Sequence, residues 1–285
     1  MSERIFFIGA GKVGRGLAYA FRAAGLQVLG VHARTPREGA TTSGSYPAAM
    51  SEANVVIIAV SDSALDDVVH SLAALAKQKG SPLTHGTIVL HTSGTVTPPA
   101  LEELRSAGSP CGTFHPLAPF STAERGAAAL RDGWVGIDGD ATACAAARRL
   151  AAAIGARTVN IPARGKARYH AAAVMASNFP VVLAAIAARL LTESGMEERA
   201  AEQVVQRLMA GAVSNLEHGS PRSVLTGPVA RGDAEAIASH RAALQNDPDA
   251  LSVYDALTRA AASLTGGHAR AVNDADIGRR GELKG

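Results

Sequence analysis

Cysteine and surplus charge are both scarce in this sequence. Its 285 residues include only two cysteines, Cys111 and Cys144, which form no motif with each other or with a nearby histidine. A disulfide framework and a metal site are therefore not expected. The 28 Lys and Arg residues exceed the 25 Asp and Glu residues by three, and no basic stretch is interleaved with aromatic residues. We therefore expect no nucleic-acid-binding surface.

Long hydrophobic runs are nearly absent as well. A run of only four apolar residues precedes the first glycine, so the N-terminus does not resemble a signal peptide, and a cytoplasmic protein is expected. The segment 170–191 is apolar over the length of a membrane span, but it is rich in alanine and contains Asn178, Pro180 and Arg189. We therefore expect a buried helix of a soluble domain and no contact with a membrane.

What the sequence does contain is an alternation of strand and helix patterns in its first half. Short apolar or β-branched segments predict strands at 4–9, 26–32, 54–60, 86–92, 111–115, 133–138 and 156–161. Beyond residue 162 the patterns predict helices only, at 167–193, 196–217, 233–245 and 249–265. The sequence thus predicts a doubly wound, mostly parallel α/β Rossmann domain over 1–162 and an all-α domain over 163–285.

A glycine-rich turn directly follows the first predicted strand. Gly9, Gly11 and Gly14 have GxGxxG spacing and open a predicted helix. The first glycine permits a tight turn, the second lets a pyrophosphate approach the backbone, and the third lets helix and strand pack closely. Phosphates then lie at the helix N-terminus. The turn predicts a dinucleotide site formed by Gly9, Ala10, Gly11, Lys12, Val13 and Gly14; the alternative is a glycine-rich turn without a ligand.

The end of the second predicted strand indicates which dinucleotide binds. NAD sites place an acidic residue there, on the ribose 2′-hydroxyl. Here the strand continues into Arg34 and Thr35, and Glu38 comes only after a proline. A guanidinium and a hydroxyl suit a 2′-phosphate, so we expect NADP (NADPH) as the cofactor, held by Arg34 and Thr35. The alternative is that Arg34 and Arg37 are ordinary solvated surface charges.

Polar residues gather where other predicted strands end. The strand 54–60 leads into Val60 and Ser61, Ser93 follows the strand 86–92, and the strand 111–115 ends at His115. Ligands in open α/β sheets bind beyond the carboxyl ends of the strands. We therefore expect Val60 and Ser61 beside the cofactor, and Ser93 and His115 beside a substrate. In the alternative, Ser61 caps the following helix and His115 is a turn residue.

The stretch YHAAAVMASN, residues 169–178, adds two candidates on a helix. At about 100° per residue, His170, Val174 and Asn178 fall on one face. An imidazole can supply a proton, so His170 is a candidate catalytic residue and Asn178 a candidate for the site wall. Alternatively, His170 bonds a backbone carbonyl, and Asn178 satisfies the backbone group that Pro180 leaves free.

Four segments together resemble a known family: HTSG, GTFHPLAPFS, YHAAAVMASN and LTGPVARGDAEAIASHRAAL. They are similar to the Rossmann-like proteins with a C-terminal domain of unknown function 2520, within the 6-phosphogluconate dehydrogenase-like group of NADP oxidoreductases. The resemblance implies a nucleotide domain, a helical domain and a homodimer formed through the helical domain. Within TGPVARGD, Thr226 and Arg231 are candidates for recognising an anionic substrate, whereas Asp233 is also suited to cap a helix.

One departure from the group concerns the helix that carries His170. Several relatives have Lys-x-x-x-Asn there, in which the Lys transfers a proton and the Asn holds the substrate. Asn178 matches the Asn, but Val174 stands where the Lys would be, so His170 or His115 would have to serve instead. We expect an NADPH-dependent oxidoreductase that transfers hydride to a small carbonyl or imine, such as a ketopantoate-like 2-oxo acid. The alternatives are a non-catalytic NADP-binding sensor or scaffold and a reductase of a flavin-like cofactor.

Overall fold

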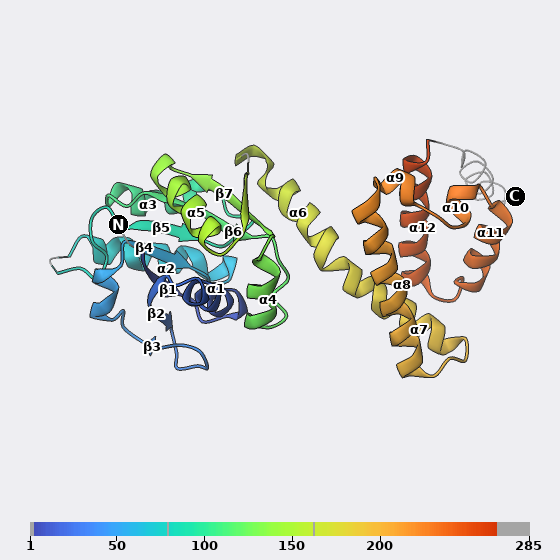
Figure 1. Cartoon of the computed structure of the whole chain (residues 1–285), viewed down its shortest axis with the longest axis horizontal. Coiled ribbons are helices and arrows are strands. Elements are labelled where there is room, and N and C mark those ends of the chain that lie inside the picture. Colours follow the sequence, from blue (N-terminus) through green and yellow to red (C-terminus); the bar gives the residue numbers. More distant parts are fainter. Residues whose placement is uncertain (1–2, 79, 162, 267–285) are drawn as a thin grey trace, which may run out of the picture. The chain divides into compact units, whose positions relative to one another are not determined.

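The computed structural model describes residues 3–78, 80–161 and 163–266. The chain divides into two compact units, Met1–Pro180 and Val181–Gly285 (Figure 1). The first unit thus extends 18 residues beyond the boundary predicted from the sequence at residue 162. It includes the helix that carries His170, so this histidine is described together with the sheet.

The first unit contains one eight-stranded sheet in the order β3-β2-β1-β4-β5-β6-β7-β8. Only the pair β6 and β7 is antiparallel, so the predicted mostly parallel, doubly wound sheet is confirmed. The strand order reverses between β1 and β4, which is where such sheets bind ligands. The strands are β1 Arg4–Ile8, β2 Gln27–Ala33, β3 Thr42–Ser43, β4 Val55–Ile58, β5 Ile88–His91, β6 Cys111–Pro116, β7 Trp134–Gly139 and β8 Arg157–Asn160.

Successive residues of the strands face opposite sides of the sheet, and helices cover both sides. One apolar cluster joins Phe7, Ile57 and Phe114 to helices α1, α4 and α5. The other joins Phe6 and Ile58 to helices α2 and α3. These helices are α1 Lys12–Ala23, α2 Asp62–Ala76, α3 Glu102–Ser106, α4 Ala123–Leu130 and α5 Ala141–Ala153.

The same alternation places several polar side chains on the face covered by α2 and α3. Val89 and Cys111 belong to the cluster on that face. His91 lies two residues after Val89, while Thr113 and His115 continue the alternation from Cys111. All three therefore point to the side of the sheet where the short helices α3 and η2 (Pro98–Leu101) lie.

The remaining helices begin with α6, which closes the first unit. The helix predicted over 167–193 is interrupted at Asn178, where α6 ends and α7 begins. Pro180 explains the break, because proline has no N–H to bond within a helix but is tolerated in a first turn. The helices are α6 Lys166–Ser177, α7 Phe179–Glu193, α8 Glu198–His218, α9 Pro221–Val224, α10 Pro228–Arg231, α11 Ala234–Ala243 and α12 Pro248–Leu264.

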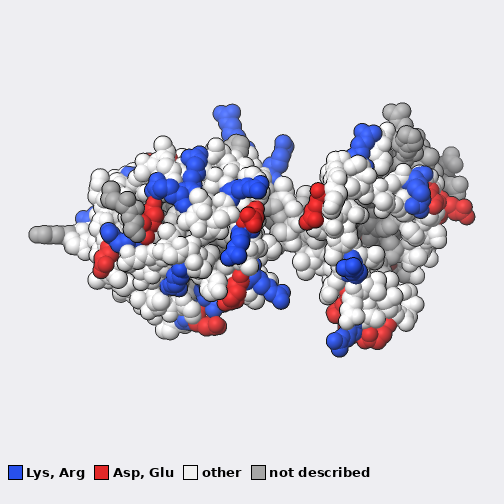
Figure 2. All heavy atoms as spheres, in the orientation of Figure 1, with Lys and Arg blue, Asp and Glu red and all other residues white. Residues whose placement is uncertain are grey.

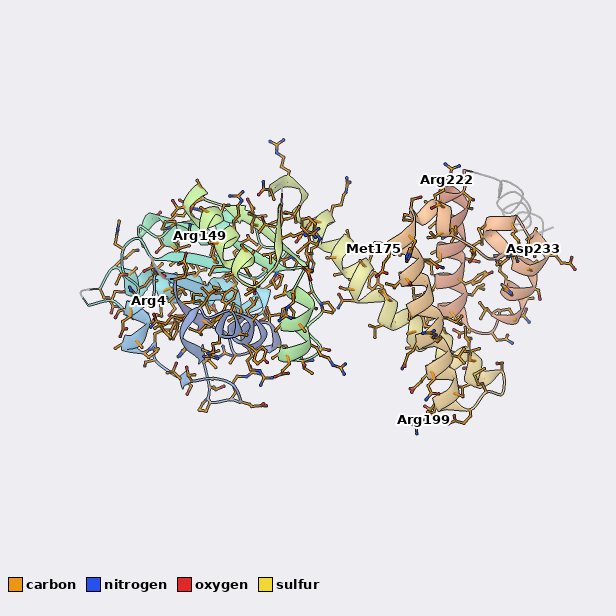
Figure 3. All side chains as sticks on the ribbon, in the orientation of Figure 1. Arg4, Arg149, Met175, Arg199, Arg222 and Asp233 are labelled. Carbon is orange, nitrogen blue, oxygen red and sulfur yellow. The ribbon has the colours of Figure 1, made fainter. Side chains whose placement is uncertain are left out.

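The expectation that segment 170–191 is buried within the chain is wrong. The helical stretch Lys166–Glu193 is long and apolar enough to cross a membrane by length and composition alone, and none of its apolar window is buried. Met175 on α6 and Val181 on α7 are 65% and 69% exposed, and Figure 3 shows Met175 standing away from its ribbon. Figure 2 shows acidic and basic side chains interspersed over the face of the first unit, without a block of one sign.

Candidate active site

The glycines of the turn after β1 are needed for different structural reasons. Gly9 has φ +115°, and a Cβ there would lie 2.2 Å from the Ala59 carbonyl oxygen. A Cβ on Gly14 would lie 2.0 Å from the Gly9 carbonyl oxygen. Gly9 and Gly14 therefore allow the turn, β4 and α1 to pack closely. A Cβ on Gly11 would meet no atom within 4 Å, so its backbone borders open space at the N-terminus of α1.

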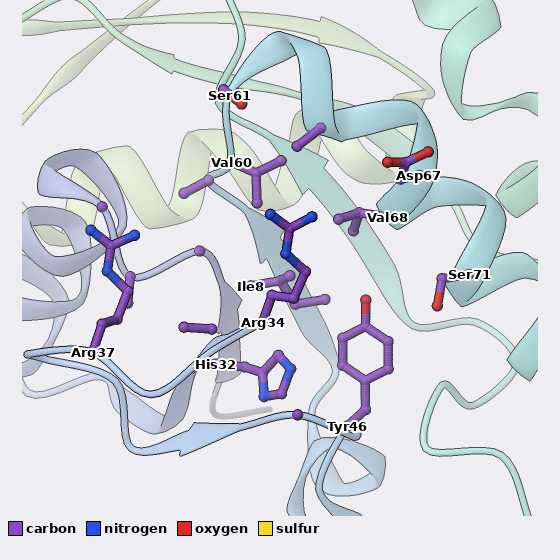
Figure 4. A pocket seen from close by; sticks show the side chains of 17 residues that line it. Ile8, His32, Arg34, Arg37, Tyr46, Val60, Ser61, Asp67, Val68 and Ser71 are labelled. Atoms are coloured by element: carbon purple, nitrogen blue, oxygen red, sulfur yellow. The ribbon is translucent and has the colours of Figure 1, made fainter.

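That open space belongs to a pocket of about 510 Å³ beyond the ends of β1, β2 and β4 (Figure 4). Arg34 and Arg37 both line it, and neither guanidinium has an ion-pair partner among the described residues. Tyr46 and Ser71 form the wall opposite the glycine turn. Two unpaired cations beside the N-terminus of a helix favour an anionic ligand such as a phosphate ester.

The pocket takes in six of the ten residues predicted to bind the cofactor: Gly9, Ala10, Gly11, Arg34, Val60 and Ser61. Lys12, Val13, Gly14 and Thr35 are not among the residues that line it. Ser61 occupies the N-cap position of α2 without a side-chain cap, because its hydroxyl bonds that of Ser63. The Ser61 hydroxyl is therefore oriented by Ser63 and does not bond the backbone N–H groups at the start of α2.

The loop after β5 is tied to the start of α2. Asp62 accepts a hydrogen bond from the Thr95 hydroxyl. The Ser93 hydroxyl accepts from the backbone N–H groups of Thr95 and Val96, at 3.2 and 3.1 Å. Ser93, a predicted substrate contact, is only 8% exposed, so its hydroxyl shapes this loop. The loop then places Gly94 next to β6.

A chain of buried polar groups lies beneath that loop. Lys166, the first residue of α6, is 2% exposed; its ammonium donates to the Thr113 hydroxyl at 2.8 Å and to the Val96 carbonyl, and lies 3.5 Å from Asp138. Because the Thr113 oxygen accepts from Lys166, its own hydrogen is directed to Nε2 of His91, 3.0 Å away. The charge of Lys166 is thus compensated by three segments of the sheet edge.

The pKa values of this buried chain are displaced in a consistent direction. Burial lowers the pKa of Lys166, and Asp138 offsets part of that effect. Burial lowers the pKa of His91 to about 3, and the nearby charge of Lys166 lowers it further. His91 is therefore neutral at physiological pH, with its hydrogen on Nδ1, where it has no partner among the described residues.

A second polar group lies beside Gly94 and contains both predicted histidines. Nδ1 of His115 lies 2.8 Å from the hydroxyl of Tyr169, and the rings of His115 and His170 are 5.7 Å apart. A Cβ on Gly94 would lie 2.8 Å from Nε2 of His115 and 2.5 Å from Nδ1 of His170. The structure thus brings His115 and His170 to one point at the end of β5, and Nδ1 of His170 has no partner among the described residues.

Asn178, a further predicted site residue of the first unit, lies away from this point. Asn178 is eight residues beyond His170, about 12 Å along the helix axis, and its side chain is exposed and accepts a hydrogen bond from Ser177. Thr226 and Arg231 belong to the second unit and remain predicted substrate contacts. Asp233 caps α11 by accepting from the Ala236 N–H, as the alternative for that residue predicts.

Lys166, Tyr169 and Tyr46 are site residues that sequence reasoning missed. The strand end HTSG already pointed to His91, and alternation along β5 and β6 puts this residue on the same face as His115. Lys166 lies between the last predicted strand, at 156–161, and the helix predicted over 167–193, and no local pattern distinguishes it from a solvated lysine. Tyr46 lies between β3 and η1 (Ala48–Glu52), where no periodicity exists.

Comparisons with protein families divide the chain in the same two parts as the resemblance. Residues 3–116 match a Rossmann-like domain, and residues 134–261 match a domain of unknown function, DUF2520. The chain is therefore a Rossmann-like protein with a C-terminal DUF2520 domain. His91, Gly94 and His115 come from the first domain, and Lys166 and His170 come from the second. The polar groups at the end of β5 are thus formed by both family domains, within one compact unit.

No curated protein sequence matches the chain, but solved structures do. A protein assigned as an NADP oxidoreductase, from Bacteroides fragilis, is 22% identical with a TM-score of 0.71, over 92% of this chain and 98% of that one. A pyrroline-5-carboxylate reductase from Streptococcus pyogenes is 16% identical with a TM-score of 0.62, over 92% and 99%. An imine reductase from Myxococcus stipitatus, in complex with NADP+, is 16% identical with a TM-score of 0.57, over 93% and 96%. These likenesses establish a shared fold.

Proposed function

We propose that this protein is an NADPH-dependent reductase of the 6-phosphogluconate dehydrogenase-like group, acting on a small carbonyl or imine compound. The observation that carries the proposal is the pair of unpaired guanidinium groups, Arg34 and Arg37, in the pocket beside the glycine turn. No acidic residue stands at the tip of β2 to take a ribose 2′-hydroxyl. The structures of similar fold that are described as NADP oxidoreductase and imine reductase support the same class.

The residues of the pocket fit NADP(H) in chemistry and in position. The backbone at Gly11 and the N-terminus of α1 would hold the pyrophosphate, because they border open space. Arg34 and Arg37 would bind the 2′-phosphate, with Arg37 in the role predicted for Thr35. Val60 and Ser61 line the pocket at the end of β4, next to β5, and would contact the cofactor on the side nearer the histidines.

The bound cofactor would supply a hydride, and the chain's own residues would bind and orient the substrate and provide a proton. Gly94 lies three residues beyond the end of β5, the strand next to β4, and His115 is the penultimate residue of β6, the following strand in the sheet. The imidazole groups of His115 and His170 are the polar groups available there to a carbonyl oxygen or imine nitrogen. An imidazolium can give its proton to a developing alkoxide or amine, which is the role we propose for His170.

The substrate class rests on the charge of the second unit as well as on the histidines. We propose that Thr226 and Arg231 bind a substrate carboxylate; Asn178, which is exposed and about 12 Å along the helix axis from His170, has no part in this proposal. A 2-oxo acid such as ketopantoate and a cyclic imino acid share this carboxylate.

We also propose that the protein is a homodimer and works in the cytoplasm. The dimer would form through the helical unit, because exposed apolar side chains on α7 and α8 require a partner surface. The two free cysteines, Cys111 and Cys144, suit a reducing compartment.

A substrate screen combined with a binding measurement tests the proposed function. We expect NADPH to bind more tightly than NADH, and a 2-oxo acid or cyclic imine to accelerate NADPH oxidation. In the variant His170→Ala, oxidation should fall at least tenfold while NADPH affinity is unchanged. Turnover that survives His170→Ala unchanged would remove this residue from the mechanism.

Val174 supports a second candidate, a non-catalytic NADPH-binding protein. The position one turn before Asn178 carries a half-buried isopropyl group instead of the proton-transferring lysine of several relatives. This candidate predicts tight NADPH binding, no turnover with any carbonyl or imine in the screen, and no effect of His170→Ala beyond stability.

A further inference from the structure

The hydroxyl of Tyr169 determines which nitrogen of His115 carries hydrogen. It lies 2.8 Å from Nδ1 and has no other hydrogen-bond partner among the described residues. Burial raises the pKa of Tyr169 to about 12, so the phenol keeps its proton. If it accepted a hydrogen bond from Nδ1, its own O–H would have no partner among the described residues, whereas as the donor it pairs its hydrogen with the Nδ1 lone pair. The hydroxyl therefore donates to Nδ1.

The charge state of His115 completes the assignment. Burial lowers the pKa of His115 to about 4, and the neighbouring His170 and Lys166 lower it in the same direction. The ring is therefore neutral at pH 7 and carries a single hydrogen. Because Nδ1 accepts from Tyr169, that hydrogen is on Nε2.

The opposite nitrogen of His115 is the one without a partner in the protein. Nε2 has no hydrogen-bond partner among the described residues and, unlike Nδ1 of His170, is not one of their fully buried unpaired atoms. It approaches the same point beside Gly94 as Nδ1 of His170. Gly94 makes this arrangement possible, because a side chain there would occupy the space between the two rings.

We propose that Tyr169 is a positioning residue that fixes His115 in its Nε2–H form, so that this N–H donates a hydrogen bond to the C=O or C=N group of a substrate bound beside Gly94. The inference rests on the proposed function and adds a division of roles to it. A neutral imidazole N–H polarises the double bond and keeps its proton. Hydride adds to the carbon, the π electron pair moves to the oxygen or nitrogen, and the imidazolium of His170 supplies the proton that completes the O–H or N–H.

The second unit supplies a matched control pair. Nδ1 of His240 lies 2.9 Å from the hydroxyl of Tyr254, with ring centroids 5.8 Å apart and planes at 85°. The corresponding values for His115 and Tyr169 are 2.8 Å, 5.5 Å and 73°. Replacement of either tyrosine by phenylalanine removes the same hydroxyl and leaves a ring of the same shape. His240, however, lies on an exposed surface.

The first measurement is the tautomer of His115 in the unmodified, substrate-free protein, by long-range ¹H–¹⁵N NMR at pH 7. We expect Nε2 to give the signal of a protonated ring nitrogen and Nδ1 that of an unprotonated one. In Tyr169→Phe the two signals should move toward a mixture of tautomers, while Tyr254→Phe should leave His115 unchanged. A His115 that carries hydrogen on Nδ1 in the unmodified protein would overturn the proposal.

The second measurement is steady-state reduction of the best substrate from the screen. Tyr169→Phe should lower kcat about tenfold, the effect of one weakened hydrogen bond, with NADPH affinity unchanged. Gly94→Ala should abolish turnover, because its Cβ would lie 2.8 Å from Nε2 of His115 and 2.5 Å from Nδ1 of His170 and would force the two rings apart. If Tyr169→Phe shifts the tautomer but not kcat, the positioning role is wrong although the protein is a reductase. If no substrate turns over, the proposed function fails while the tautomer result stands on its own.

Discussion

The two compact units bury their apolar residues very differently. The first unit contains two apolar clusters, one on each face of its sheet, and most apolar side chains of its parallel strands are inaccessible. In the described part of the second unit only four apolar residues are buried: Ala201, Val205, Ile237 and Ala250. Leu208 and Val213 on α8 are 68% and 61% exposed.

This difference in burial shows that an apolar helix pattern in the sequence does not specify which surface packs against the apolar residues. A parallel sheet must be covered on both faces by segments of its own chain, because the crossover connections are themselves helices. A layer of helices can instead be completed by a second polypeptide. The first unit thus contains its own core, whereas the second unit shows an apolar surface of the kind that marks an interface.

The largest effect is expected from a larger residue in the glycine turn. Gly14→Val places a side chain against the Gly9 carbonyl oxygen, within 2.0 Å of the Cβ position, so β1 and α1 can no longer pack. NADPH binding, measured by fluorescence titration, should be lost, and the first unit should unfold at lower temperature in calorimetry. Gly11→Ala is the control, since its Cβ meets no atom. This variant should fold normally and only bind NADPH more weakly, and equal thermal destabilisation by both would contradict the assigned roles.

A charged residue introduced on the exposed apolar surface of the second unit tests whether that surface packs against a second polypeptide. If the proposed dimer forms through this surface, Leu208→Asp should convert it to a monomer in sedimentation or light-scattering measurements, because a carboxylate would be buried there without a partner. Tyr19→Asp is matched to it: Tyr19 is 55% exposed on α1 of the first unit. This change should not alter the molecular mass. A monomeric unmodified protein would show that the exposed surface has another purpose.

A substitution at the end of β2, in the first unit, tests the proposed contact with the 2′-phosphate of NADPH. Arg34→Ala should weaken NADPH binding by about 10- to 100-fold, the range for a lost charge-assisted hydrogen bond, and leave NADH binding nearly unchanged. Isothermal titration with both cofactors measures the ratio. Arg22→Ala, at the exposed end of α1, controls for general loss of positive charge. An equal loss for NADPH and NADH would exclude a 2′-phosphate contact.

The smallest effect is a pH dependence confined to the first unit. His91 and His115 have folded-state pKa values of about 3 and 4, below the ordinary value of 6.5. Between these values and pH 6.5 the unfolded chain binds more protons, so the free energy of unfolding decreases as the pH falls through this window. His91→Asn should make this decrease shallower in denaturant titrations. A slope unaffected by His91→Asn would show that other groups titrate there.

The sequence predicts the parts of the site that depend on local pattern. Gly9, Gly11 and Gly14 mark the turn because backbone clashes there are set by residues close in the chain or in the adjacent strand. Arg34 and Ser61 could be predicted because each directly follows a strand whose end is visible in the sequence pattern. The site residues from other segments are not local: Lys166 is recognisable only once Thr113 and Asp138 lie beside it. The exposure of α7 was mispredicted because an apolar helix has the same sequence pattern whether its partner surface belongs to the same chain or to a second chain.

The buried ammonium of Lys166 has a consequence for the order in which the first unit folds. Its partners at Val96, Thr113 and Asp138 are 70, 53 and 28 residues away in the sequence and lie on three different segments. A lysine that leaves water before all three are in place loses its hydration without compensation. Docking of α6 therefore follows completion of β6 and β7, and the last turn of chain to join the sheet brings Tyr169 and His170 with it.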